Sequence, residues 1–164
     1  MSTFIASATS YSTQGCPTIP FYIFYSMFGF QRVADLIWSA ADQRARGFMI
    51  GATSGRTTLN GEGLQHQDGR SLLMAHTNPA IRAYDPAFAY ELATIIRSGI
   101  DEMYVDEKDV MYYIAVYNEN HPMPPKPAGS EEGIIKGMYK LRSAPKGDGP
   151  VVRLIGSGPI MLQL

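Results

Sequence analysis

Pro20-Phe-Tyr-Ile-Phe-Tyr-Ser-Met27 is the stretch that decides the fold of this 164-residue protein. It is rich in β-branched and aromatic residues and has no polar face, a pattern typical of a strand that is buried on both sides in a parallel sheet. Apolar residues then recur at helical spacing from Phe30 through Arg46, and we expect Gly47 to end that helix. The sequence therefore predicts a strand that is followed directly by a helix.

The same alternation continues along the rest of the chain. Asp85 and Pro86 are residue types that favour an N-cap and a first helical position, and apolar residues follow at helical intervals to about Tyr104. Further strands are expected at 48–53, 80–84, 109–117, 138–141 and 151–155, and a short helix at 131–136. Strands that alternate with helices predict an α/β fold with a largely parallel sheet.

Composition narrows the class of protein. A hydrophobic fraction of 45% with 18% charged residues suits one compact domain, and a net charge of −1 creates no field that would attract nucleic acid or an anionic membrane. The longest apolar run, 19–30, is too short to span a bilayer. Cys16 is the single cysteine, which excludes an internal disulfide and fits a reducing compartment. We therefore expect a cytoplasmic protein with no nucleic-acid or membrane partner.

A long glycine-rich loop follows the second expected strand, at 54–71. Loops beyond roughly 12–15 residues are uncommon unless they are functional, and ligands gather beyond the carboxyl ends of parallel strands. The loop holds Arg56, Glu62, His66 and Asp68, and a histidine beside carboxylates can act as a tuned acid or base. A structural or merely exposed histidine is the alternative. No two histidines share a ligand-like spacing, so no metal site is predicted.

Tyr25 and Phe28 fall at the carboxyl end of the first expected strand. Two interpretations of these aromatic residues stay open at this point. They can belong to the core, as most aromatic residues of a buried strand must, or they can stack on a planar heterocycle.

Several segments of the chain resemble one known family, the homodimeric bacterial-type E1 component of the pyruvate dehydrogenase complex. That family depends on thiamine diphosphate and has a transketolase-like architecture. The similarity covers nearly the whole chain, and its most specific motif is the loop sequence that ends at His66. The segments that carry it are Ile19 to Arg32, Gln43 to Phe48, Thr53 to His66, Tyr84 to Glu91, Tyr117 to Asn120, Glu131 to Gly133 and Gly156 to Gly158.

The resemblance implies a three-layer, pyrimidine-binding domain over residues 1–143, incomplete at its N-terminus, and a linker with the first strand of a truncated C-terminal domain over 144–164. By motif match, Phe28 would stack on the aminopyrimidine of the cofactor and Tyr25 would lie beside it. His66 would face the reacting centre as the catalytic residue, and Arg32 would support the pocket from behind. Gln67 and Arg70 depart from the family pattern.

The resemblance also implies an activity and partners. The parent enzyme would decarboxylate pyruvate, work as a homodimer and acetylate the lipoyl domain of the dihydrolipoyl acetyltransferase. Magnesium would be bound by a domain absent from this chain, and the glutamate that activates the cofactor would lie upstream of Met1. We therefore expect the isolated chain to be inactive. Two alternatives are another thiamine diphosphate-dependent transketolase-like enzyme and a non-catalytic remnant or interaction module.

Overall fold

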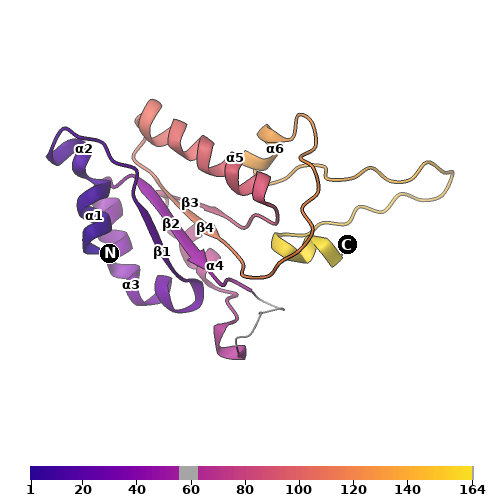
Figure 1. Ribbon diagram of the computed structural model, residues 1–164, viewed down its shortest axis with the longest axis horizontal. Helices are drawn as coiled ribbons and strands as arrows, with labels where there is room; N and C mark the ends of the chain where they lie inside the picture. Colours follow the sequence, from indigo (N-terminus) through magenta and orange to yellow (C-terminus); the bar gives the residue numbers. More distant parts are fainter. Residues whose placement is uncertain (56–62, 164) are drawn as a thin grey trace.

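A parallel sheet forms the centre of the protein (Figure 1). The computed structural model describes residues 1–55 and 63–163, and within them four strands pair in the order β1-β2-β4-β3. All three pairings are parallel. The strands are β1 (Phe21–Tyr25), β2 (Gly47–Ala52), β3 (Ile81–Tyr84) and β4 (Met111–Ala115).

Helices cover both faces of this sheet, which confirms the expected α/β fold. The helices are α1 (Ser2–Ala8), α2 (Ser10–Thr13), α3 (Ser26–Asp42), α4 (Ser71–His76), α5 (Ala89–Ile100) and α6 (Glu131–Ile135), with 3₁₀ turns η1 (Leu64–His66) and η3 (Gly158–Gln163) and a π-helical turn η2 (Asp101–Val105). One core cluster joins the sheet to α1, α3 and α4, and the other joins it to α5, η2 and α6. The result is three layers.

The first strand is less buried than its sequence predicts. Residues Phe21, Ile23 and Tyr25 are 46%, 67% and 50% exposed, whereas Tyr22 and Phe24 pack against the core on the other face. The expectation of burial on both sides was wrong because β1 is an edge strand. The core cluster that packs against α5 includes residues of β2, β3 and β4 but none of β1. The face of β1 on that side of the sheet is therefore exposed.

Two expected helix boundaries were also wrong. Helix α3 ends at Asp42, and Gly47 is instead the first residue of β2, where an added Cβ would lie 2.8 Å from the Pro20 side chain. Helix α5 begins at Ala89, four residues after the expected N-cap Asp85. Its capping contacts come from Glu91, whose carboxylate accepts hydrogen bonds from the main chain just before the helix.

Residues 137–157 form an extended arm that reaches away from the sheet (Figure 1). The strands expected at 138–141 and 151–155 do not form, and the apolar residues of the second segment are exposed. Strand propensity alone did not suffice there, because a strand needs a neighbouring strand to satisfy its backbone hydrogen bonds. The division into domains at residue 143 stays a prediction. In the part of the chain that the structure describes, no helix is long and apolar enough to cross a membrane.

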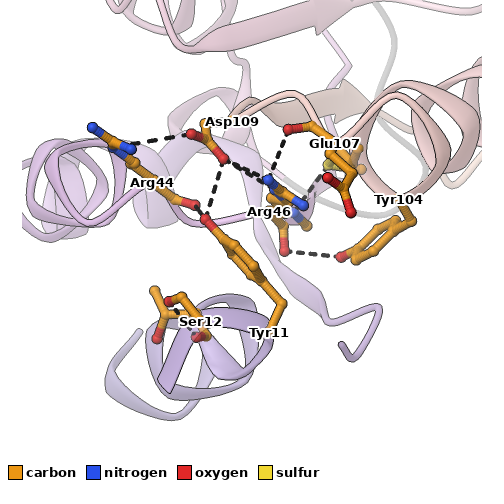
Figure 2. A network of polar contacts seen from close by, with 10 residues as sticks. Tyr11, Ser12, Arg44, Arg46, Tyr104, Glu107 and Asp109 are labelled. Atoms are coloured by element: carbon orange, nitrogen blue, oxygen red, sulfur yellow. Dashed lines mark hydrogen bonds and ion pairs between the residues drawn. The ribbon is translucent and has the colours of Figure 1, made fainter. Parts of the chain in front are cut away.

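A buried arginine ties the amino-terminal edge of the sheet together (Figure 2). The Arg46 guanidinium donates to Asp109 at 2.8 and 3.1 Å and to the Glu107 carbonyl at 2.7 Å. The guanidinium carbon of Arg46 lies 3.9 Å from the centre of the Tyr11 ring, and the Tyr104 hydroxyl donates a hydrogen bond to the Arg46 carbonyl oxygen at 3.0 Å. This network joins α2, the start of β2 and the segment before β4.

Candidate functional site

The first two strands end at the same edge of the sheet. Tyr25, the last residue of β1, is in register with Ala52, the last residue of β2. The chain turns from β1 directly into α3, and it leaves β2 for the loop that ends at η1. Since ligand sites of open parallel sheets lie beyond this edge, the structure places both segments where a site is expected.

His66 lies beside two aromatic rings at this edge. Its imidazole is perpendicular to the ring of Phe28, with centroids 5.1 Å apart, and also perpendicular to the ring of Tyr25, at 5.5 Å. Phe28 belongs to the first turn of α3 and is half-buried, and Tyr25 is 50% exposed. The structure therefore brings together three residues that the sequence singled out, and they come from β1, α3 and η1.

The Nδ1 atom of His66 is buried and has no hydrogen-bond partner among the described residues. An unsatisfied polar atom costs roughly 1–3 kcal/mol, so it marks a place where a bound polar group is favourable. This atom is the strongest sign of ligand binding at the site.

Arg32 lies one helical turn after Phe28 and contacts it directly. Its guanidinium carbon is 5.0 Å from the centre of the Phe28 ring, and the side chain is exposed to solvent. A cation over an aromatic face is worth about 0.5–1 kcal/mol at an exposed position. The contact restrains the orientation of the Phe28 ring, and the supporting role of Arg32 stays a prediction.

A buried polar network lies behind these side chains. Asp68 is 4% exposed and accepts hydrogen bonds from the Ser26 hydroxyl and from the backbone nitrogens of Arg70 and Ser71, at 3.0 and 2.9 Å. Burial raises the pKa of Asp68, but the hydrogen bonds from Ser26 and Ser71 outweigh it and hold that pKa below its ordinary value. The carboxylate that was expected to tune His66 is thus engaged with α3 and α4.

Sequence patterns did not indicate the other members of this network. Ser26 and Tyr113 are fully buried, and their hydroxyl oxygens are 2.6 Å apart. Tyr113 gives no signal because it lies within an apolar strand. Asp68 itself was noticed in the sequence only as a carboxylate in the same loop as His66.

Two of the remaining candidates, Arg56 and Glu62, fall outside the described residues. His76 is exposed at the end of α4, and His121 contacts the Ala87 carbonyl at 3.0 Å. Within residues 1–55 and 63–163, no three histidine, cysteine or acidic residues lie together as metal ligands would.

The backbone is strained where the chain leaves β2. Thr53 has a φ of 55°, in the left-handed region that a β-branched residue rarely adopts. The next residue, Ser54, is 2% exposed and donates from its nitrogen to the Val116 carbonyl at 3.0 Å. Gly55 then accepts from the nitrogen of Asp68 at 3.1 Å, which brings the two ends of the loop together. Such strain concentrates at functional sites.

The fold is an α/β domain with a candidate ligand site at the carboxyl edge of a parallel sheet. Residues 1–124 match the family model of the pyruvate dehydrogenase E1 component middle domain. The chain belongs to this family, and the resemblance inferred from its motifs is confirmed.

Relatives extend this match over the whole chain. The pyruvate dehydrogenase E1 component of Pseudomonas aeruginosa is 58% identical over 164 residues, which are 100% of this chain and 19% of that protein. The E1 component of Escherichia coli K12 is 58% identical over 158 residues, which are 96% of this chain and 18% of that protein. The E1 component of Mycolicibacterium smegmatis is 55% identical over 162 residues, which are 98% of this chain and 17% of that protein. The chain thus spans less than a fifth of the relatives it matches.

Proposed function

We propose that this chain supplies the pyrimidine-side half of the active site of a pyruvate dehydrogenase E1 component. In this function, the parent protein decarboxylates pyruvate with thiamine diphosphate and transfers the acetyl unit to a lipoyl group of an acyltransferase. The observation that carries the proposal is the buried Nδ1 atom of His66, which has no partner among the described residues and lies beside two aromatic rings. Identity of 58% to two E1 components supports the choice of reaction.

The side chains present fit an aromatic cofactor. Phe28 and Tyr25 offer partly exposed rings, and planar heterocycles prefer to pack against such rings. Arg32 holds the ring of Phe28 from α3, so its orientation is set before a ligand arrives. When bound, thiamine diphosphate supplies the carbanion stabilisation that allows a 2-oxo acid to lose carbon dioxide.

His66 handles the proton in this proposal. Its imidazole can donate a hydrogen bond to an oxygen on which negative charge develops. The perpendicular contacts with Phe28 and Tyr25 restrict rotation of the ring. A fixed donor costs no reorganisation at the moment of reaction, which is the main benefit of a preorganised site.

The test replaces the matching segment of the Pseudomonas aeruginosa E1 component with this chain. The hybrid is assayed with thiamine diphosphate, magnesium and a free lipoyl domain, either with pyruvate or with a ketose phosphate donor. We expect acetylation of the lipoyl domain when pyruvate is the donor and no turnover when the ketose phosphate is the donor. Turnover of the ketose phosphate would favour another transketolase-like enzyme, and an inactive hybrid that folds and dimerises would favour a non-catalytic role. The 164-residue chain by itself is expected to be inactive.

A further inference from the structure

Asp68 is a buried carboxylate, and its hydrogen-bond donors within residues 1–55 and 63–163 are uncharged groups. One of its oxygens accepts from the Ser26 hydroxyl, and the other accepts from the backbone nitrogens of Arg70 and Ser71. Burying a charge is costly unless such donors surround it. The charged carboxylate of Asp68 therefore favours the one arrangement in which the Ser26 hydroxyl and the two backbone nitrogens all donate to it.

The donors belong to two segments that carry the site. Ser26 is the first residue of α3 and precedes Phe28 by two positions, while Asp68 follows His66 by two positions. The Ser71 hydroxyl also donates to the Ser26 carbonyl, at 2.9 Å. The start of α3 and the segment after His66 are therefore joined by a side-chain and a main-chain contact.

Tyr113 of strand β4 contacts Ser26 and sets the direction of the hydrogen bonds in this network. Since Ser26 donates to a carboxylate, which can only accept, the Tyr113 hydroxyl must donate to Ser26 across their 2.6 Å contact. Burial raises the pKa of Tyr113 to about 12, so its hydroxyl stays protonated at neutral pH. Hydrogen bonds thus run in one direction, from Tyr113 on β4 through Ser26 to Asp68.

We propose that Asp68 is a positioning residue, which holds the His66 ring perpendicular to Phe28 by tying the His66 segment to the first turn of α3. Asp68 acts through His66 and does not contact substrate or cofactor. The effect of Asp68 on catalysis rests on the proposed function, whereas its effect on the position of the His66 ring does not.

The first measurement is a double-mutant cycle in the hybrid E1 component described above. Asp68→Asn replaces one of the two acceptor oxygens with a donor, so either Ser26 or the backbone nitrogens lose their acceptor. We expect it to lower kcat about tenfold to a hundredfold, as a small misplacement of a reacting group does. In the His66→Ala background, the same change should alter kcat less than twofold. An equal loss in both backgrounds would overturn the proposal, because a merely structural role does not depend on His66.

The second measurement follows the ring itself. With ¹³C-labelled histidine, the His66 imidazole signal is assigned by its loss in His66→Ala, and the rings of Phe28 and Tyr25 shift it from the position of free histidine. Asp68→Asn should move the signal toward that position. Ser26→Ala should move it in the same direction by less, and Asp35→Asn, an exposed change on α3, should leave it in place.

The two measurements separate two kinds of failure. A hybrid without pyruvate turnover would contradict the proposed function, and the imidazole signal would still decide the position of His66. An unchanged signal in both Asp68→Asn and Ser26→Ala would overturn the role of Asp68 even in an active enzyme. Ser26→Ala keeps the main-chain donors to Asp68, so it tests the connection if Asp68→Asn fails to fold.

Discussion

His66 is perpendicular to Phe28, with ring planes at 86° and centroids 5.1 Å apart. One residue ends the loop that follows β2, and the other lies in the first turn of the helix that follows β1. Because these strands are parallel neighbours, the pairing of Tyr25 with Ala52 starts both segments at the same edge of the sheet. The strand order therefore determines the edge at which the two residues meet, and the contacts of Asp68 join their segments.

Replacing His66 should affect turnover far more than cofactor binding. In the hybrid E1 component, His66→Ala removes the proton donor, and general acid–base groups contribute about 10²- to 10⁴-fold to rate. We expect kcat for pyruvate to fall within that range and the Kd for thiamine diphosphate to change less than about threefold, since the aromatic rings are still present. His76→Ala is the matched control, because His76 is exposed at the end of α4. A larger change in Kd than in kcat would reject the role assigned to His66.

Phe28 should contribute to cofactor affinity. Phe28→Leu keeps an apolar side chain but removes the aromatic face, whose packing is worth roughly 0.5–1.5 kcal/mol beyond buried area. We expect about a tenfold weaker Kd for thiamine diphosphate, measured by fluorescence or calorimetry in the hybrid. The same change at Phe21, an aromatic residue at the other end of β1, serves as control and should leave Kd unchanged. Equal effects at both positions would mean that Phe28 acts through the strand and not through a ligand.

The sequence predicted the fold class and singled out three residues that lie together in the structure. It did not predict which side chains are buried around them. Strand and helix periodicity located β2, β3 and β4, and the loop motif pointed to His66. Burial could not be predicted for β1, because an apolar strand has the same composition at the edge of a sheet as at its centre. Position in the sheet depends on which strands pair, and that is not a local property of the chain.

The polar network behind the site was harder to predict for a related reason. Asp68 was noticed as a carboxylate near His66, but its partners Ser26 and Tyr113 are distant in sequence. A single serine or tyrosine within an apolar segment carries no periodic signal. The two segments at 138–141 and 151–155 show the converse, since local propensity predicted strands that have no partner strand in the structure.

Asp68 should make stability depend on pH in the acid range. Its folded-state pKa is lowered by hydrogen bonds, so the native state binds that proton less tightly than the unfolded chain, where the pKa is about 3.9. The stabilisation is complete above the unfolded-state value and is lost as pH falls through the folded-state value. Asp68→Asn should lower the free energy of unfolding by about 2 kcal/mol at pH 7. The difference between the two proteins should shrink as the pH approaches 2.

Urea unfolding of the chain at several pH values measures this effect. Asp35→Asn is the control, because Asp35 is exposed on α3 and surface substitutions usually change stability by less than about 0.5 kcal/mol. A difference between Asp68→Asn and the unchanged protein that stays constant from pH 7 to pH 2 would contradict the prediction.

Arg46 should stabilise the fold at the edge of the sheet opposite the site. Its side chain is 10% exposed, and Arg46→Met would remove two hydrogen bonds to Asp109 and one to the Glu107 carbonyl, leaving Asp109 with Tyr11 and Arg44 as partners (Figure 2). Removing one partner of a largely buried ion pair is costly, and because Asp109 is 34% exposed we expect a loss of about 2 kcal/mol in the free energy of unfolding. Arg44 provides the comparison, since it is 76% exposed and lies 4.0 Å from the same carboxylate. Arg44→Met should cost no more than about 0.5 kcal/mol, as exposed ion pairs do. Equal losses in urea unfolding would show that net charge, and not the buried geometry of Arg46, stabilises this edge.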